Sequence, residues 1–342
     1  MNFENFCLSV LGMVPQSVRK TLGTWLNEDC GHGDATVRAL GNWANGLCKA
    51  KIVAKEQLVL CGNDLAAEVF RLAAGSASQI NVTVQLADGT TVEKGTVVLE
   101  AEGLAAALLM GERTALNLMS RLSGIATHTH GICQKMEICR KQLEAQEQNN
   151  GQAGQRLVAP TKPLRVPQLL ETRKTTPGLK IYEKYATRVG GARNHRFALD
   201  SGAMLKENHF RACAQFGVDF AAVISRLKHN LPLLAGLEVE VTNLDELEIA
   251  LGNKCEVVML DNFSMDDVAR AVEKRDRLSP TTLLELSGNL DRIDPFQLVA
   301  SGVDLMSMGA LIHQAKWVDL SLQFEILNVE KSGESFAEGR LQ

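Results

Sequence analysis

The sequence predicts an α/β protein in which a mixed N-terminal part precedes a parallel sheet. Two observations support this class. The first part of the chain combines β-rich and helical patterns, and from residue 168 onward strand and helix patterns alternate regularly. Strands that alternate with helices form parallel sheets, because each helix carries the chain back to the start of the next strand. Either an α/β barrel or a doubly wound sheet satisfies this pattern.

The first stretch, residues 1 to about 125, predicts a small α+β domain. Residues 51–60 and 81–98 are β-rich, and the second segment contains turns at Asp88-Gly89 and Lys94-Gly95. Helical patterns occupy residues 63–74 and 103–121. The next stretch, 142–167, is polar, with Gln, Asn and Gly first and Pro later. Such a composition buries little apolar surface, so we expect a surface loop or insertion there.

Four apolar strand candidates follow, with starts roughly 20–26 residues apart, the spacing of βα units. They lie at 236–242, 256–262, 282–288 and 303–309. The helices between them have clear N-terminal residues. Asn243 precedes one helical pattern, and Ser264 precedes another with Asp267 three residues later, as in a capping box.

Composition excludes several classes of protein. The 342 residues are 45% apolar and 22% charged, typical of a folded domain, and the net charge of −4 gives no basic field for nucleic acid. The N-terminus predicts neither a signal peptide nor a membrane span. Eight Cys without a CxxC pair indicate reduced thiols and a cytoplasmic location. Cys30, His32 and Asp34 have metal-ligand spacing, but no second half-site completes them.

The carboxyl ends of parallel strands carry the chemistry in both candidate folds. Glu240 and Asp261 end two neighbouring strands, where carboxylates suit Mg²⁺ or a hydroxyl-rich ligand. Small residues end the next two strands and suit a phosphate held by backbone N–H groups. These are Ser287, Gly288, Asn289, Met308 and Gly309. The alternative is that the acids cap helices and the glycines only turn the chain.

Basic residues concentrate in the middle of the chain. Most of those in residues 171–180 and 189–209 have few acidic partners: Arg173, Lys174, Arg193, His195, Arg196, Lys206 and His209. A solvated surface would also accept such residues. Guanidinium and ammonium groups together, however, are what a small polyanion needs, so we favour a site for an acidic ligand beside a sugar phosphate.

These motifs resemble quinolinate phosphoribosyltransferase, also called carboxylating nicotinate-nucleotide pyrophosphorylase. The resemblance covers nearly the whole chain in order. The matching strings are LNEDCGHGDAT (26–36), GERTALNLMSRLSGIAT (111–127), ETRKTTPGLK (171–180), NHR (194–196), LKENH (205–209), EVEV (238–241), MLDNF (259–263), ELSGN (285–289) and SMGAL (307–311). Departures are small: Glu171 stands where Asp is common, Asn289 where Gly is common, and Gly190-Gly191-Ala192 replaces three glycines.

The resemblance implies an N-terminal α/β sandwich domain (1–125, joined by about 312–342) and an incomplete, open α/β barrel (126–311) with its site at the carboxyl ends of the strands. It implies Mg²⁺-dependent transfer of phosphoribosyl from phosphoribosyl pyrophosphate to quinolinate, with decarboxylation, giving nicotinate mononucleotide, pyrophosphate and CO₂. It also implies a homodimer, or a higher homo-oligomer, without nucleic-acid or membrane partners.

Roles follow from the resemblance residue by residue. Arg173, His195 and Arg196 would bind the quinolinate carboxylates, joined by Arg113 from the partner subunit. Lys174 and Lys206 would contact pyrophosphate and substrate anions. Glu240 and Asp261 would hold ribose hydroxyls and Mg²⁺, directly or through water. The 5′-phosphate pocket would consist of Ser287, Gly288, Asn289, Met308 and Gly309.

Three alternatives remain open at this point. A paralogue could use another acceptor, such as nicotinate without decarboxylation, although four bases favour a dicarboxylate. A Schiff-base lyase could use Lys174 or Lys206 as nucleophile. A non-catalytic metabolite sensor could have kept the binding site, and it would release no pyrophosphate.

Overall fold

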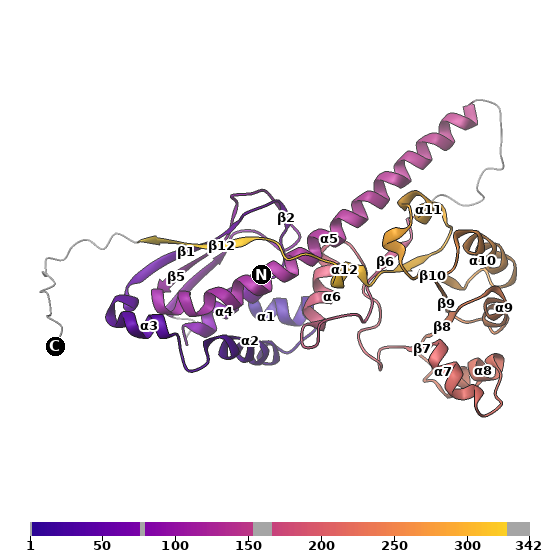
Figure 1. Ribbon diagram of the computed structural model, residues 1–342, viewed down its shortest axis with the longest axis horizontal. Coiled ribbons are helices and arrows are strands. Elements are labelled where there is room, and N and C mark those ends of the chain that lie inside the picture. The colour runs from indigo at the N-terminus through magenta and orange to yellow at the C-terminus, as the bar shows by residue number, and fades with distance from the viewer. Residues whose placement is uncertain (1, 76–78, 153–165, 327–342) are drawn as a thin grey trace, which may run out of the picture. The chain divides into compact units, whose positions relative to one another are not determined.

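The computed structural model describes residues 2–75, 79–152 and 166–326 (Figure 1). The chain divides into two compact units. One consists of Met1–Ser123 and the segment from Val318 onward, and the other of Gly124–Trp317. Helix α5 (Ala105–Gln152) runs from the first unit into the second. Among the described residues, no helix is long and apolar enough to cross a membrane.

The first unit contains a four-stranded antiparallel sheet of order β12-β1-β5-β3. Its strands are β1 (Leu47–Ala54), β3 (Ile80–Val84), β5 (Val97–Leu104) and β12 (Leu320–Ile326). Helix α4 (Asn63–Ala73) packs against β3 and β5 and buries Leu65, Val69 and Phe70. The predicted β-rich and helical segments therefore combine as a sheet with a helix on it, and the returning strand β12 completes the sheet beside β1.

Further helices and a pair of short strands complete the described part of this unit. Helices in the first forty residues were not predicted by the sequence patterns. The elements are α1 (Phe3–Asn5), η1 (Phe6–Leu11), α2 (Pro15–Cys30), α3 (Ala35–Leu40), η2 (Gly41–Asn45) and the paired strands β2 (Leu58–Val59) and β4 (Thr91–Val92).

Helix α5 corrects the prediction of a loop over 142–167. Residues 142–152 continue the helix, and residues 153–165 lie outside the described part. Gln, Glu, Lys and Ala favour helix even where they bury little apolar surface. Arg140 also pairs with Glu137 and Glu144 along the helix, at spacings that stabilise exposed helices. At the described positions 142–146 the side chains are exposed or half-buried, so the polar composition did not indicate the absence of helix.

The second unit contains a six-stranded parallel sheet of order β6-β11-β10-β9-β8-β7. Its strands are β6 (Gln168–Leu170), β7 (Ala203–Leu205), β8 (Leu237–Val241), β9 (Val257–Asp261), β10 (Leu283–Ser287) and β11 (Leu305–Ser307). The four predicted strands are confirmed as β8–β11. Because β6 and β7 stand at opposite edges of the sheet, the barrel is open.

Helices connect these strands and cover one face of the sheet, as Figure 1 shows for α9 and α10 beside β8–β10. They are α6 (Lys180–Val189), α7 (Glu207–Ala214), α8 (Phe220–Asn230), α9 (Leu244–Gly252), α10 (Met265–Leu278), η4 (Leu290–Arg292), α11 (Pro295–Ala300) and α12 (Ala310–His313). The predicted caps are confirmed: Asn243 accepts backbone N–H groups at the start of α9, and Ser264 accepts the N–H of Asp267 in α10.

Alternation along the strands determines which residues face the barrel interior. In β8, Leu237, Val239 and Val241 belong to the hydrophobic core, whereas Glu238 and Glu240 point to the opposite face. In β10, Leu284 and Leu286 belong to the same core. By the same period of two, Glu285 and Ser287 lie on the interior face. The interior is therefore lined with polar side chains from several strands.

Candidate functional site

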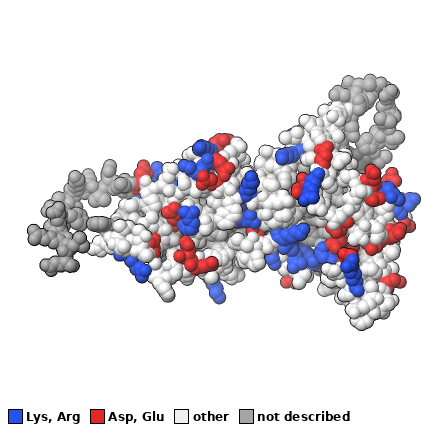
Figure 2. All heavy atoms as spheres, viewed as in Figure 1, with Lys and Arg blue, Asp and Glu red and all other residues white. Residues whose placement is uncertain are grey.

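The carboxyl ends of the six parallel strands bring the predicted site residues together. Two cavities of about 430 and 370 Å³ lie there. Both are lined by residues at or just after the strand ends: Thr172, Lys174, Lys206, Glu240, Asp261, Ser287 and Ser307. Figure 2 shows Lys and Arg side chains gathered between α6 and β7, beside Asp and Glu side chains of the sheet. The site therefore presents both signs of charge to one ligand space.

Twelve of the thirteen predicted residues line these cavities. The first cavity adds Gly288, Asn289, Met308 and Gly309 to the shared set, and the second adds Arg173, His195 and Arg196. Arg113 is an exposed residue of α5 within the first unit, so its donation across a subunit interface stays a prediction. Sequence reasoning missed other lining residues: Thr172, Met204, Met259, Asn262, Leu290, Asp291, Arg292, Ser307, Ala310, His313 and Gln314.

The turn after β10 requires glycine. Gly288 has a φ of +100°, and a Cβ there would lie 2.3 Å from Asn262 Oδ1 and 3.1 Å from its backbone nitrogen. Asn262 itself adopts a positive φ and donates from Nδ2 to Asp261 Oδ2 at 2.9 Å. Gly309, after β11, is less restricted, because its φ is −63° and a Cβ there would lie 2.8 Å from Cδ of the flexible Lys174 side chain. Gly288 therefore allows the backbone to form the cavity wall.

The acidic side of the site is formed by Glu240 and Asp261. Glu240 forms an ion pair with Lys206. Burial, followed by the charge of Glu240, raises the pKa of the Asp261 carboxyl. A raised pKa shows that Asp261 has less positive charge around it than its negative form needs. A cation or hydroxyl donors from a ligand would supply that compensation.

The basic side consists of Arg173, Lys174 and Arg196. Among the described residues, no carboxylate lies within ion-pair distance of these three. Arg196 donates to Gly202 O at 2.9 Å and contacts Met204 Sδ at 3.7 Å. Burial and the neighbouring Arg173 lower the pKa of the Arg196 guanidinium. Cations without carboxylate partners are suited to bind an anion, and the contacts of Arg196 also orient its guanidinium.

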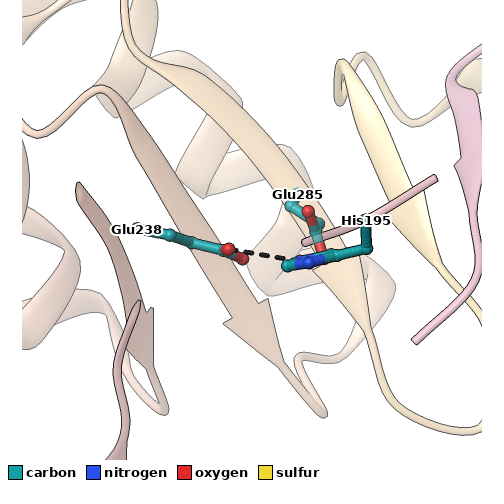
Figure 3. Close-up of side chains that lie close together, drawn as sticks. All are labelled: His195, Glu238 and Glu285. Carbon is teal, nitrogen blue, oxygen red and sulfur yellow. Dashed lines mark ion pairs between the residues drawn. The ribbon is translucent and has the colours of Figure 1, made fainter. Parts of the chain in front are cut away.

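Two interior carboxylates, Glu238 and Glu285, lie beside the imidazole of His195 (Figure 3). Its Nε2 atom is 3.2 Å from Glu238 Oε2 and 3.7 Å from Glu285 Oε1. Its Nδ1 atom accepts the backbone N–H of Arg196 at 2.7 Å. Burial lowers the pKa of the imidazole, but the hydrogen bond and charge of Glu238, with the charge of Glu285, outweigh burial and raise it. Burial and then Glu238 raise the pKa of Glu285 to about 7.

Behind this site, Glu171 and Lys184 form an ion pair with no exposed side-chain surface. Glu171 also accepts from Asn194 Nδ2 at 3.0 Å and from the His195 backbone N–H at 3.1 Å. Lys184 Nζ donates to His195 O at 3.0 Å. This pair joins the loop after β6 to the segment before β7, so it fixes the two basic motifs relative to each other.

Glu285 makes stability depend on pH. The pKa of Glu285 is about 7 in the folded protein and ordinarily 4.5. Between these two pH values, the carboxyl therefore keeps its proton in the native state but has lost it in the unfolded chain. The free energy of unfolding then falls as pH rises through this window. We expect Glu285→Gln to gain stability over the wild type between pH 5 and pH 8, on the order of 2 kcal/mol. Urea unfolding at both pH values measures this gain.

Glu102→Gln, at an exposed position of β5, is the matched control and should show a difference from the wild type that does not change with pH. A pH-independent difference for Glu285→Gln as well would contradict the prediction.

Fold and cavity together define a protein that holds a polyanionic ligand at the carboxyl ends of an open parallel barrel. Comparison with known proteins is consistent with this class. The N-terminal domain of quinolinate phosphoribosyl transferase matches residues 34–123, and the C-terminal domain matches residues 152–323.

Individual relatives agree with these matches. The chain is 37% identical over 302 residues to a probable carboxylating nicotinate-nucleotide pyrophosphorylase of Synechocystis, covering 88% of this chain and 90% of that protein. Its counterpart in Bacillus subtilis is 32% identical, with 91% and 94% covered. The solved nicotinate-nucleotide pyrophosphorylase of Francisella tularensis superposes with a TM-score of 0.74 at 32% identity, covering 91% and 96%. The chain belongs to the quinolinate phosphoribosyl transferase family.

Proposed function

We propose that this chain transfers phosphoribosyl from phosphoribosyl pyrophosphate to quinolinate and releases pyrophosphate and CO₂, forming nicotinate mononucleotide for NAD biosynthesis. The observation that carries the proposal is that Arg173, Lys174 and Arg196, which no described carboxylate pairs with, line the same two cavities as Glu240, Asp261 and the glycine turns. The names of the relatives support the same reaction. The eight Cys are all free thiols, which supports a cytoplasmic location.

Mg²⁺ fits the acidic side of the site. Glu240 and Asp261 offer hard oxygen ligands, and the raised pKa of Asp261 indicates charge that a cation would neutralise. These two residues would hold the ion, directly or through water. When bound, Mg²⁺ supplies positive charge against the pyrophosphate of the substrate.

The chain's own groups account for the other steps. Departure of pyrophosphate leaves positive character on ribose C1, which Glu240 and Asp261 offset. Lys174 faces the cavity and neutralises the leaving group. Arg173 and Arg196 orient the quinolinate so that its ring nitrogen reaches C1. Bond formation makes that nitrogen cationic, and the C2–carboxylate bond then breaks with its electron pair held by the ring until a proton replaces CO₂.

The test is an incubation of the protein with phosphoribosyl pyrophosphate, Mg²⁺ and either quinolinate or nicotinate. Equal amounts of nicotinate mononucleotide and CO₂ from quinolinate, and none from nicotinate, are expected. Product from nicotinate and none from quinolinate would show that the chain is a paralogue with a different acceptor. No pyrophosphate from either acceptor would indicate a sensor, and trapping of a lysine adduct by borohydride would indicate a Schiff-base lyase.

We also expect Arg113→Ala to lower turnover about 100-fold, because it removes a cation that a partner subunit would bring to the quinolinate carboxylates. Because the side chain is exposed, the variant should fold like the wild type. Mixed with Lys206→Ala, it should regain activity through hybrid dimers that contain one intact site. No recovery after confirmed subunit exchange would rule out a shared site.

A further inference from the structure

We propose that Ser307 delivers the proton that replaces CO₂ on the pyridine ring, and that Glu285 resupplies Ser307 from the amino end of the barrel. The inference rests on the proposed function, because only a decarboxylating enzyme needs this proton. It leaves the anion-binding role that the resemblance implies for His195 unchanged.

Ser307 and Glu285 lie on neighbouring strands of the barrel interior. β10 pairs with β11 so that Glu285 lies opposite Leu305, and Ser287 opposite Ser307. Ser307 is therefore two residues nearer than Glu285 to the carboxyl ends of the strands. It lines both cavities of the candidate site, whereas Glu285 lines neither. A proton that passes from Glu285 to Ser307 thus moves toward the ligand.

Both side chains contain an oxygen atom that the fold leaves unsatisfied. Ser307 is 3% exposed and Glu285 is 1% exposed. Within the described part of the chain, Ser307 Oγ and Glu285 Oε1 have no hydrogen-bond partner. Buried polar atoms are seldom left in this state, because the desolvation of each one is unfavourable, and the exceptions concentrate where atoms have a chemical task. The Ser307 hydroxyl is therefore free to turn toward a substrate.

Glu285 is suited to give and regain a proton near neutral pH. Burial, followed by the charge of Glu238, raises the pKa of Glu285 to about 7. The charge of His195 and the hydroxyl of Ser307 oppose this rise, as does the charge of Lys206. The contribution of the hydroxyl indicates that Ser307 lies close to the carboxyl, as a short proton path requires.

A separate cavity supplies Glu285 with water from the other end of the barrel. This lower cavity, of about 440 Å³, is lined by Glu285 and by the first residues of three strands, Leu237, Val257 and Leu305. The exposed side chain of Glu256 also lines it, so the lower cavity reaches solvent. Water there returns a proton to Glu285 without passing through the substrate cavities.

His195 also lines a substrate cavity and the lower cavity, but its ring is a poor path for protons. Its Nδ1 atom accepts the backbone N–H of Arg196 at 2.7 Å. Proton passage from one ring nitrogen to the other would place a proton on Nδ1, donor against donor with that N–H. The imidazole can therefore contact a substrate carboxylate while the proton travels through Ser307.

The proposed transfer accounts for each proton. The C2–carboxylate bond breaks, CO₂ leaves, and the electron pair stays on C2. That pair takes the hydroxyl proton of Ser307 while the Ser307 oxygen takes the carboxyl proton of Glu285. The two transfers are concerted, because serine alone is too weak an acid. The Glu285 carboxylate then takes a proton from water in the lower cavity, so that each turnover consumes one proton and releases one CO₂.

The experiment is a rapid-quench single turnover with quinolinate, phosphoribosyl pyrophosphate and Mg²⁺, in which pyrophosphate reports the transfer and CO₂ reports the decarboxylation. Ser307→Ala should release pyrophosphate within about threefold of the wild-type rate but CO₂ about 100-fold more slowly. The mononucleotide that still carries both carboxylates should accumulate. Ser307→Thr keeps the hydroxyl and should stay within about threefold of the wild type for both products.

Glu285→Gln should separate the two rates in the same way, and it serves as the test if Ser307→Ala does not fold. Ser321→Ala is the matched control, because Ser321 Oγ is also buried without a described partner but belongs to the first unit. It should leave both rates unchanged.

Equal losses of both rates in Ser307→Ala, or CO₂ release at the wild-type rate, would overturn the inference. So would a stoichiometric transition metal on His195, Glu238 and Glu285, whose ligand atoms lie close enough to hold one, because a metal-bound carboxylate has no proton to give. A wild type that releases neither pyrophosphate nor CO₂ would instead reject the proposed function, and this inference with it.

Discussion

Lys174→Met should lower kcat about 1,000-fold, the largest catalytic effect that we expect from one exposed side chain. Lys174 lines both cavities, and no described carboxylate pairs with it. Its charge is therefore available to the departing pyrophosphate. A methionine keeps the length and apolar stem but removes that charge. Steady-state kinetics at saturating substrates measure the loss.

Lys180→Met is the matched control, since Lys180 begins α6 and does not line either cavity. It should change kcat less than about threefold. The melting temperature of Lys174→Met should remain near that of the wild type, because the side chain is exposed. A kcat that falls by less than tenfold would show that Lys174 does not act on the leaving group.

Lys184→Met should destabilise the protein by about 3–5 kcal/mol, the largest stability effect that we expect. Lys184 and Glu171 are both fully buried, so removal of the ammonium leaves Glu171 charged without its partner. Burial lowers the pKa of Lys184, which shows that desolvation already opposes the charge before Glu171 compensates it. Chemical denaturation at constant pH measures the change in the free energy of unfolding.

The double variant Lys184→Met, Glu171→Leu tests the cause. Removing both charges should recover much of the lost stability, since an apolar pair of similar volume avoids the unpaired carboxylate. Activity should remain low in the double variant, because Glu171 also holds the backbone of His195. A double variant as unstable as Lys184→Met would mean that packing, not charge, determines the loss.

The sequence predicted most of what local patterns control. Apolar runs, cap residues and strand spacing located β8–β11, and the strand-end rule located Glu240 and Asp261. Period-two alternation along β8 places Glu238 on the face of Glu240, so this pattern could also have predicted that Glu238 faces the interior. Helix α5 was underestimated because composition was used to judge burial, which does not decide helix formation.

Other features depend on residues far apart in the chain. His195 meets Glu238 and Glu285 only in the folded sheet, where β8 and β10 lie on either side of β9. The buried Glu171–Lys184 pair could not be predicted from the sequence, because a charged residue on a helix is usually exposed. The motif resemblance identified twelve residues that line the cavities but not the network that holds them.

The returning strand β12 has a consequence for biosynthesis. β1 pairs along its length with β12, and Asp319 contacts Glu56 across 263 residues of chain. During synthesis, the second unit emerges before β12. The first unit therefore cannot complete its sheet until then, and β1 remains an unpaired edge strand. Exposed edges attract other chains. A nascent chain arrested before Leu320 should thus need chaperone protection, even with its barrel complete.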